Sequence, residues 1–189
     1  MRAKPITRRT VLSRRDAMTA ETRAAASEQI ALGASRLLEN LAAGSVVGLY
    51  APKGTEVDTT RIDQIIRARG LRVVYPRIVD GERRLAFHEV TIDELVRATF
   101  GLCEPRVDAP SVSLDELAAL VIPGLAFDRR GHRIGWGRGY YDATLAAAPG
   151  ALRIGLGFEC QVIDDVPHDP HDASLHYVVT EVATYRAPD

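Results

Sequence analysis

The chain has 189 residues, of which 46% are hydrophobic and 26% charged, a balance typical of one globular domain with a real core. Its 24 lysines and arginines against 25 aspartates and glutamates give no excess of positive charge that would indicate a nucleic-acid partner. No apolar run reaches the length of a membrane span, and Cys103 and Cys160 are too few for a disulfide framework. We therefore expect a single cytoplasmic domain over residues 1–189, a monomer with neither nucleic-acid nor membrane partners.

The N-terminal arm, residues 1–18, is strongly basic and has no acidic residue before Asp16. Such a start could belong to a targeting peptide, but no apolar segment follows it, so a solvated basic helix is the simpler interpretation. Thr19 is a typical N-cap for a second helix, which should run to about Leu41 because its apolar residues recur at helical spacing.

Two short apolar runs, residues 45–50 and 71–76, are predicted to be buried strands. Between them, Asp58 or Thr59 can cap a third helix. The loop before this helix contains Glu56, at the carboxyl end of a strand, where open α/β sheets bind their ligands. From the residues alone, a solvated loop glutamate is the simpler alternative.

The middle of the chain gives weaker signals. Asp80 and Gly81 form a turn signal that predicts a hairpin between residues 78 and 88. Residues 93–99 are expected to form a short helix, and residues 100–113, which contain two prolines, an irregular segment.

Segment 121–142, VIPGLAFDRRGHRIGWGRGYYD, concentrates five glycines and four arginines. Glycines let the backbone turn tightly, so that several N–H groups can face one concavity and bind phosphate. Arg133 and Arg138 could add bidentate hydrogen bonds to phosphate oxygens. A helix predicted from Tyr140 would direct its N-terminal dipole at the same place, and Asp142 in its first turn could hold a Mg²⁺ that bridges phosphates.

A glycine-rich surface loop with solvated arginines is the alternative interpretation of this segment. It lacks the Gly-Lys-Ser/Thr ending of one common phosphate loop and the glycine spacing of the dinucleotide fingerprint. The combination of a preceding strand, a long glycine loop, Trp136, two tyrosines and an aspartate favours ligand binding.

The C-terminal part begins with further predicted strands at residues 117–122 and 152–158. The tail then places His168, His171 and His176 among four aspartates, a mixture of ligands that suits several metals and selects none. Strands alternate with helices along most of the chain, which predicts a single-domain three-layer α/β/α sandwich with a largely parallel central sheet.

The sequence PGLAFDRRGHRIGWGRGYYD closely resembles the signature of the 5-formyltetrahydrofolate cyclo-ligase (5,10-methenyltetrahydrofolate synthetase) family. YAPKGTEVDT at residues 50–59 and Lys4-x-x-x-Arg8 resemble two further family elements, in the same order. The resemblance spans nearly the whole chain. It implies a three-layer α/β/α fold and a reaction in which ATP and Mg²⁺ convert 5-formyltetrahydrofolate to 5,10-methenyltetrahydrofolate, ADP and phosphate.

The resemblance also implies roles for individual residues. The implied ATP contacts are Lys4, Arg8, Arg133, Ile134, Gly135, Trp136, Gly137, Arg138, Gly139, Tyr140 and Tyr141. The implied substrate contacts are Arg8, Ala51, Glu56, Trp136, Gly137, Arg138, Gly139 and Tyr140, with Glu56 accepting hydrogen bonds from the folate ring. The implied Mg²⁺ ligands are Asp142 and Asp172, the latter five residues after Pro167. Many relatives have an acid where this chain has His176, so the role of that position stays open.

Two other functions stay open. The chain could be a non-catalytic folate- or nucleotide-binding member, although the presence of Asp142 and Asp172 argues against it. It could also be an ATP-dependent enzyme of the same fold that acts on a different formyl or acyl substrate. Glu56 would discriminate, because it would face the pterin-like ring of a folate.

Overall fold

The computed structural model describes residues 3–169 and 172–188. Its centre is an eight-stranded sheet in the order β12-β11-β10-β7-β1-β2-β3-β6. The strands are β1 (Val46–Gly48), β2 (Arg72–Ile78), β3 (Leu85–Glu89), β6 (Ser111–Val112), β7 (Leu117–Pro123), β10 (Leu152–Leu156), β11 (Tyr177–Val179) and β12 (Thr184–Arg186). The five strands from β11 to β2 pair in parallel, and β12, β3 and β6 add antiparallel edges. The prediction of a largely parallel sheet is confirmed.

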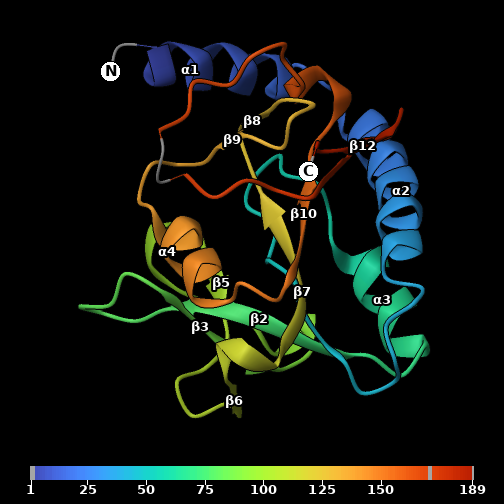
Figure 1. Ribbon diagram of the computed structural model, residues 1–189, viewed down its shortest axis with the longest axis vertical. Helices are drawn as coiled ribbons and strands as arrows, with labels where there is room; N and C mark the ends of the chain where they lie inside the picture. Colours follow the sequence, from blue (N-terminus) through green and yellow to red (C-terminus); the bar gives the residue numbers. More distant parts are fainter. Residues whose placement is uncertain (1–2, 170–171, 189) are drawn as a thin grey trace.

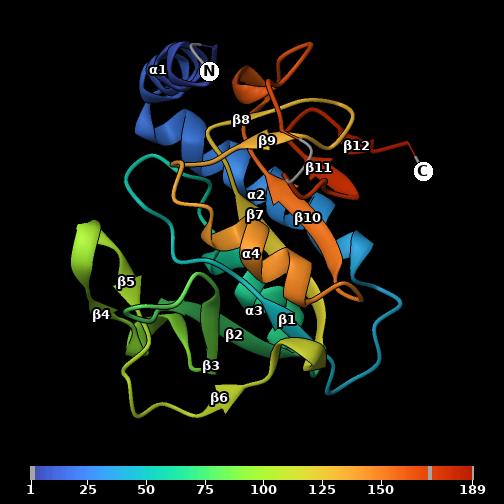
Figure 2. The same cartoon turned by 60° about the vertical axis from the view of Figure 1, so that its left-hand side comes forward.

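Helices cover both faces of this sheet (Figures 1 and 2). On one face lie α2 (Ala20–Leu37) and α3 (Thr60–Ala68), and on the other lies α4 (Tyr140–Ala147). Val121 belongs to the apolar cluster under α2 and α3, whereas its neighbour Ile122 belongs to the cluster under α4. Because successive strand residues point to opposite faces, a strand covered on both sides must be apolar throughout. The three-layer α/β/α prediction is confirmed.

The helix starts agree with the sequence signals. Thr19 caps α2, since its hydroxyl oxygen accepts a hydrogen bond of 3.2 Å from the backbone N–H of Thr22. At α3 it is the Asp58 carboxylate that accepts from a first-turn N–H, that of Thr60, at 2.8 Å. The end of α2 differs from the prediction, because the helix stops at Leu37 and not near Leu41.

The prediction of a helix at residues 93–99 is wrong. Thr91 and Glu94 form a capping box that completes only one 3-10 turn, η1 (Ile92–Glu94). The chain then becomes extended, and β4 (Val96–Arg97) pairs with β5 (Cys103–Glu104) in a separate two-stranded sheet. The reversal between them uses positive φ values at Phe100 and Gly101, 60° and 69°. Residues expected to be helical or irregular thus form a small hairpin that projects beside β2 (Figure 2).

The first helix, α1 (Ala3–Asp16), crosses one end of the molecule (Figure 1). It packs on the hairpin of β8 (Ala126–Phe127) and β9 (Arg133–Ile134) and on the 3-10 turn η4 (Glu159–Gln161). Below it, the chain runs from β1 through α3 to β2 on one side, and from β7 through α4 to β10 on the other. Ligand crevices of open α/β sheets lie where such connections diverge, here at the carboxyl ends of β1 and β7.

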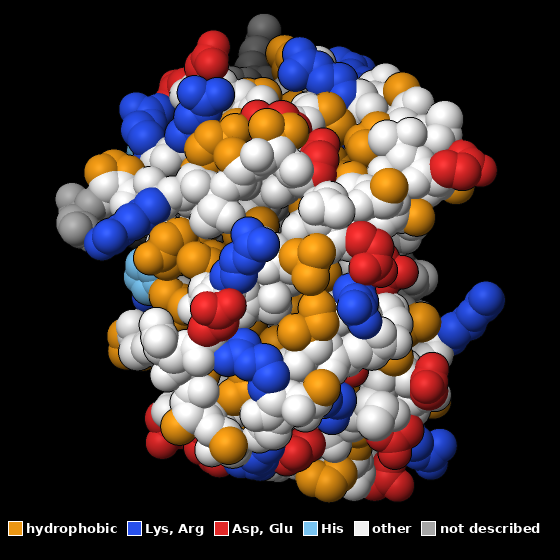
Figure 3. Space-filling view, turned by 90° about the vertical axis from the view of Figure 1, so that its right-hand side faces the viewer, with side chains coloured by type: hydrophobic (Ala, Val, Ile, Leu, Met, Phe, Trp, Pro, Cys, Tyr) orange, Lys and Arg blue, Asp and Glu red, His pale blue; other side chains and the backbone are white. Residues whose placement is uncertain are grey.

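The face built by α2 and α3 carries charged side chains of both signs among scattered hydrophobic ones (Figure 3). Among residues 3–169 and 172–188, none of the helices combines the length and the apolar character that crossing a membrane requires.

Candidate active site

A pocket of about 580 Å³ opens at the carboxyl ends of β1 and β7. Tyr50 and Ala51 follow β1 into it, and Pro123 and Gly124 border it at the end of β7. Every candidate residue from the sequence lines this one pocket: Lys4, Arg8, Ala51, Glu56, the whole run from Arg133 to Asp142, and Asp172. The structure therefore brings together four segments that are thirty or more residues apart in the chain.

The glycine loop, residues 135–139, connects β9 to α4. Gly139 is the N-cap of α4 and has a left-handed backbone with φ of 74°, a conformation that favours glycine. Gly137 has φ of 90°, and a Cβ there would come within 2.9 Å of the Arg8 guanidinium. Arg8 in turn donates from Nε to the carbonyl oxygen of Gly135 at 2.9 Å. The absence of a side chain at Gly137 thus allows Arg8 of α1 to lie directly against the loop.

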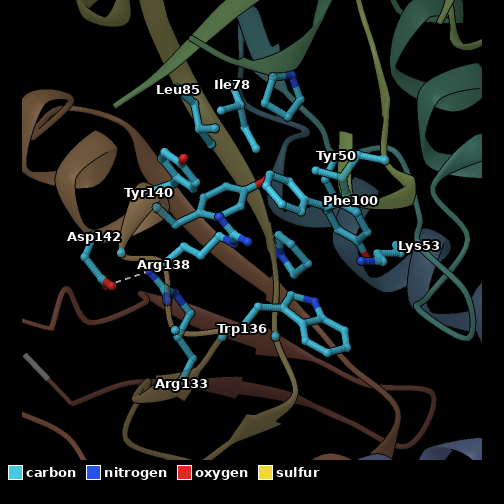
Figure 4. Close-up of a pocket in the computed structure, with 18 of the residues that line it drawn as sticks. Tyr50, Lys53, Ile78, Leu85, Phe100, Arg133, Trp136, Arg138, Tyr140 and Asp142 are labelled. Atoms are coloured by element: carbon cyan, nitrogen blue, oxygen red, sulfur yellow. Dashed lines mark hydrogen bonds and ion pairs between the residues drawn. The ribbon is translucent and has the colours of Figure 1, made fainter. Parts of the chain in front are cut away.

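Arg133 and Asp142 form an ion pair between the two ends of this loop, with Arg133 Nη2 2.8 Å from Asp142 Oδ1 (Figure 4). The arginine side chain is only 5% exposed, and its Nε has no hydrogen-bond partner among the described residues. A buried charge is costly unless it is paired. Asp142, in the first turn of α4, compensates the charge of Arg133. The backbone N–H of Ala173 also approaches Asp142 Oδ1, at 3.4 Å.

Lys4 reaches the pocket from the first turn of α1. Its Nζ lies 2.6 Å from both Asp169 Oδ2 and Asp172 Oδ2. Burial raises the pKa of Asp172, but the hydrogen bonds from Lys4 and from the backbone N–H of Asp169 outweigh burial and hold that pKa below its ordinary value. Asp172 is therefore a carboxylate at neutral pH and is joined to the N-terminal helix.

Asp142 and Asp172 are a donor set that fits Mg²⁺. Both carboxylates line the pocket beside the glycine loop, and Mg²⁺ is usually bound by one or two carboxylates together with substrate phosphates. In the part of the chain that the structure describes, no three His, Cys, Asp or Glu side chains gather into a metal-binding group.

Glu56 lines the pocket from the loop that follows β1. Its Oε2 accepts a hydrogen bond of 2.9 Å from the backbone N–H of Lys53, and its Oε1 one of 3.3 Å from Trp136 Nε1. Burial raises the pKa of Glu56 above its ordinary value, although these hydrogen bonds and nearby cations oppose the shift. The Trp136 indole is half exposed, and Lys53 Nζ lies 5.2 Å from its ring centre.

An apolar wall completes the pocket, and sequence reasoning missed it. It consists of Pro76, Ile78, Leu85, Phe100 and Leu102. Phe100, at the tip of the β4–β5 hairpin, lies under the Arg138 guanidinium at 3.8 Å from its ring centre. Figure 4 shows Tyr50, Phe100, Arg138 and Tyr140 converging on the same space from different elements. Strands β4 and β5 have two residues each, too few to show an alternating pattern in the sequence. The aromatic residue Phe100, directly before Gly101, was the one sequence signal for this part of the pocket.

The two tail histidines that the structure describes, His168 and His176, have different partners. His168 is exposed and stacks on His132 with ring centres 3.6 Å apart, whereas His171 lies outside the described residues. His176 Nδ1 accepts a hydrogen bond of 3.0 Å from the backbone N–H of Arg153, and burial together with the Arg153 charge lowers its pKa.

Comparison with known proteins decides the family. The model of the 5-formyltetrahydrofolate cyclo-ligase family matches residues 1–181. The chain belongs to this cyclo-ligase family. Among relatives named 5-formyltetrahydrofolate cyclo-ligase, that of Mycolicibacterium smegmatis is 32% identical over 72% of this chain and 74% of its own. That of Escherichia coli is also 32% identical, over 71% of this chain and 76% of its own.

A solved cyclo-ligase-family structure has the same fold. The solution structure of Aquifex aeolicus 5,10-methenyltetrahydrofolate synthetase matches 98% of this chain and 93% of its own, with a TM-score of 0.80 and 28% identity. The eight-stranded arrangement described above is therefore a cyclo-ligase fold, and the resemblance noted in the sequence is confirmed.

Proposed function

We propose that this chain is an ATP- and Mg²⁺-dependent cyclo-ligase that converts 5-formyltetrahydrofolate to 5,10-methenyltetrahydrofolate with release of ADP and phosphate. The observation that carries the proposal is the single pocket. It is lined by a glycine loop at a helix N-terminus, two carboxylates and several cations, and also by Glu56 and an apolar wall. Membership of the cyclo-ligase family supports the same reaction.

The chemistry needs alignment more than a protein nucleophile. A formamide oxygen is a poor leaving group, so the reaction requires its activation. Transfer of the γ-phosphoryl group to the formyl oxygen gives an imidate-like phosphate. N10 of the same folate then attacks the activated carbon and loses its proton, the ring closes, and phosphate leaves with the former formyl oxygen. Because N10 is already tethered to the reacting group, proximity supplies much of the second step.

The nucleotide side of the pocket suits charge stabilisation. N–H groups of the glycine loop, with Arg8, Arg133, Arg138 and Lys4, would bind the phosphates and offset charge that develops during transfer. Asp142 and Asp172 would hold Mg²⁺, which neutralises charge on the phosphate oxygens when it is bound.

The other side suits a reduced folate. The ring presents an amino group and N–H donors along one edge, and Glu56 can accept from them while the apolar wall covers the ring faces. Ala51 and the glycine loop would border the ring near the transferred phosphoryl group. We also infer a cytoplasmic monomer; Cys103 and Cys160 are both free thiols, which agrees with a reducing compartment.

The test is turnover with purified protein. Mixed with 5-formyltetrahydrofolate, ATP and Mg²⁺, it should produce the absorbance band of methenyltetrahydrofolate together with one ADP for each product. Folate binding without product would favour the non-catalytic alternative. If ATP bound but neither 5-formyltetrahydrofolate nor its analogues did, a different formyl or acyl substrate would be the better proposal.

A further inference from the structure

Arg15, in the last turn of α1, is a cation that the sequence places on a solvated helix and the structure buries. Its side chain is only 2% exposed. Its Nε donates a hydrogen bond of 3.0 Å to the Thr55 hydroxyl, which itself donates to the Asp16 carboxylate. Its Nη1 is buried and has no hydrogen-bond partner among the described residues. The neighbouring Arg14 is exposed, so burial is a property of this one position.

A buried guanidinium needs a compensating negative charge, because desolvation of an unpaired charge costs several kcal/mol. Asp16 is linked to Arg15 only through Thr55. A second acid that feels this charge is Glu56, the residue that follows Thr55. The positive charge of Arg15 favours the ionised form of its carboxyl group.

The groups around Glu56 determine how much the positive charge of Arg15 affects its ionisation. From its own loop, Lys53 contributes a backbone N–H and an ammonium group. The glycine loop contributes the indole N–H of Trp136, and Tyr50, after β1, and Tyr141, in α4, are near enough for the Glu56 charge to raise the pKa of each. Burial disfavours the ionised carboxyl, so its charge depends on these few opposing groups, of which Arg15 is the permanently charged one.

We propose that Arg15 is a positioning residue: through its hydrogen bond to Thr55 it holds the Glu56 loop in the orientation that receives the folate ring, and it places a buried positive charge beside that loop. This rests on the proposed function of the pocket. The helix that brings Lys4 and Arg8 to the nucleotide side thus also supports the folate side, through a residue that does not line the pocket.

The first experiment measures the Glu56 pKa directly, by NMR titration of its labelled carboxyl carbon in the protein without ligands. Arg15→Met should move the titration to higher pH, because a positive charge that favours the carboxylate is removed. Arg15→Lys should restore most of the original titration, and Arg14→Met, which removes an exposed charge from the same helix, should leave it unchanged. Equal titrations in Arg15→Met and the unmodified protein would overturn the proposal.

The second experiment measures the affinity for 5-formyltetrahydrofolate by calorimetry from mildly acidic to mildly alkaline pH. Arg15→Met should weaken binding roughly 10-fold at neutral pH. The acid limb, which is the pH range in which folate affinity declines on acidification, should also move to higher pH together with the Glu56 titration. A defect of folding alone would weaken binding without this change in pH dependence. Thr55→Val, which keeps the charge, should weaken binding without moving the limb, and unchanged affinity in this variant would refute the link through Thr55. If the unmodified protein bound no folate, the proposed function would fail while the NMR titration still decided the role of Arg15.

Discussion

Among individual residues, Glu56 distinguishes the folate site from the nucleotide site. Glu56→Gln keeps the size but replaces one acceptor oxygen by a donor that opposes an N–H group. An unpaired buried polar group costs about 1–3 kcal/mol, so the affinity for 5-formyltetrahydrofolate should fall roughly 10- to 200-fold. ATP affinity should hardly change. Calorimetric titration with each ligand separately measures both, and a loss confined to ATP would place Glu56 in the nucleotide site instead.

The pH dependence of folate binding follows from the same residue. The pKa of Glu56 in the folded protein lies above its ordinary value of 4.5, so the carboxyl takes up a proton at a higher pH than a free glutamate would. Folate affinity should therefore decline as the pH falls through this raised pKa. By the same sign, ionisation of Glu56 costs stability, so the stability that the protonated carboxyl contributes should be lost as the pH rises through the raised pKa. A Gln variant that kept the acid limb of binding would exclude Glu56 as its source.

Asp142 is the corresponding residue on the nucleotide side. Asp142→Asn removes a negative charge but leaves an oxygen for the buried guanidinium of Arg133, 2.8 Å away in the present pair. We expect kcat/KM to fall about 10²-fold or more, the scale of one electrostatic contribution to catalysis. The loss should be greatest at limiting Mg²⁺. Initial rates over a range of Mg²⁺ concentrations test this, and unchanged kinetics at low Mg²⁺ would remove Asp142 from the metal site.

Among the structural elements, the glycine loop depends on its contact with α1. Gly137→Ala adds a Cβ that meets the Arg8 guanidinium and forces alanine into a backbone with φ of 90°. The left-handed conformation alone costs roughly 1–2 kcal/mol, and displacement of Arg8 should raise KM for ATP about 10-fold or more. Gly44→Ala is the matched control, because Gly44 has a similar φ of 84° and its Cβ would meet nothing within 4 Å. Equal effects of the two substitutions on KM would show that the contact is unimportant.

The elements also show which parts of the site the sequence could predict. The glycine loop, the helix after it and Asp142 are adjacent in the chain, so local chemistry and spacing predicted their arrangement. The β4–β5 hairpin was missed because each strand has two residues and its reversal depends on Phe100 adopting a positive φ. Arg15 was interpreted as solvated because its burial comes from packing against residues forty positions away, which no local pattern reports.

For the molecule as a whole, the order of the strands in the sheet determines which loops meet at the pocket. Alternating strands and helices predicted a covered parallel sheet, but the strand order β10-β7-β1-β2 is what brings the Glu56 loop beside the glycine loop. That the candidate residues line one pocket is therefore a result of topology, whereas the role of each remains a prediction.

Ligand binding should stabilise this arrangement by mass action. At a concentration one hundred times the dissociation constant, 5-formyltetrahydrofolate should add about 2.7 kcal/mol, or roughly 5–10 °C in Tm for a domain of this size. Glu56→Gln should lose most of the shift caused by folate and keep the shift caused by ATP with Mg²⁺. Thermal melts of both proteins with each ligand would show this, and equal folate shifts would contradict the division of the pocket into two sides.

In the proposed reaction, the pocket aligns the γ-phosphate of ATP with the formyl oxygen of the folate. The most direct test is to label that oxygen with a heavy isotope and to analyse the phosphate released during one turnover. We predict that the label leaves the folate and appears in inorganic phosphate, with one labelled phosphate for each methenyl product. Methenyl product accompanied by unlabelled phosphate would contradict the account, because the formyl oxygen would then have left without being phosphorylated.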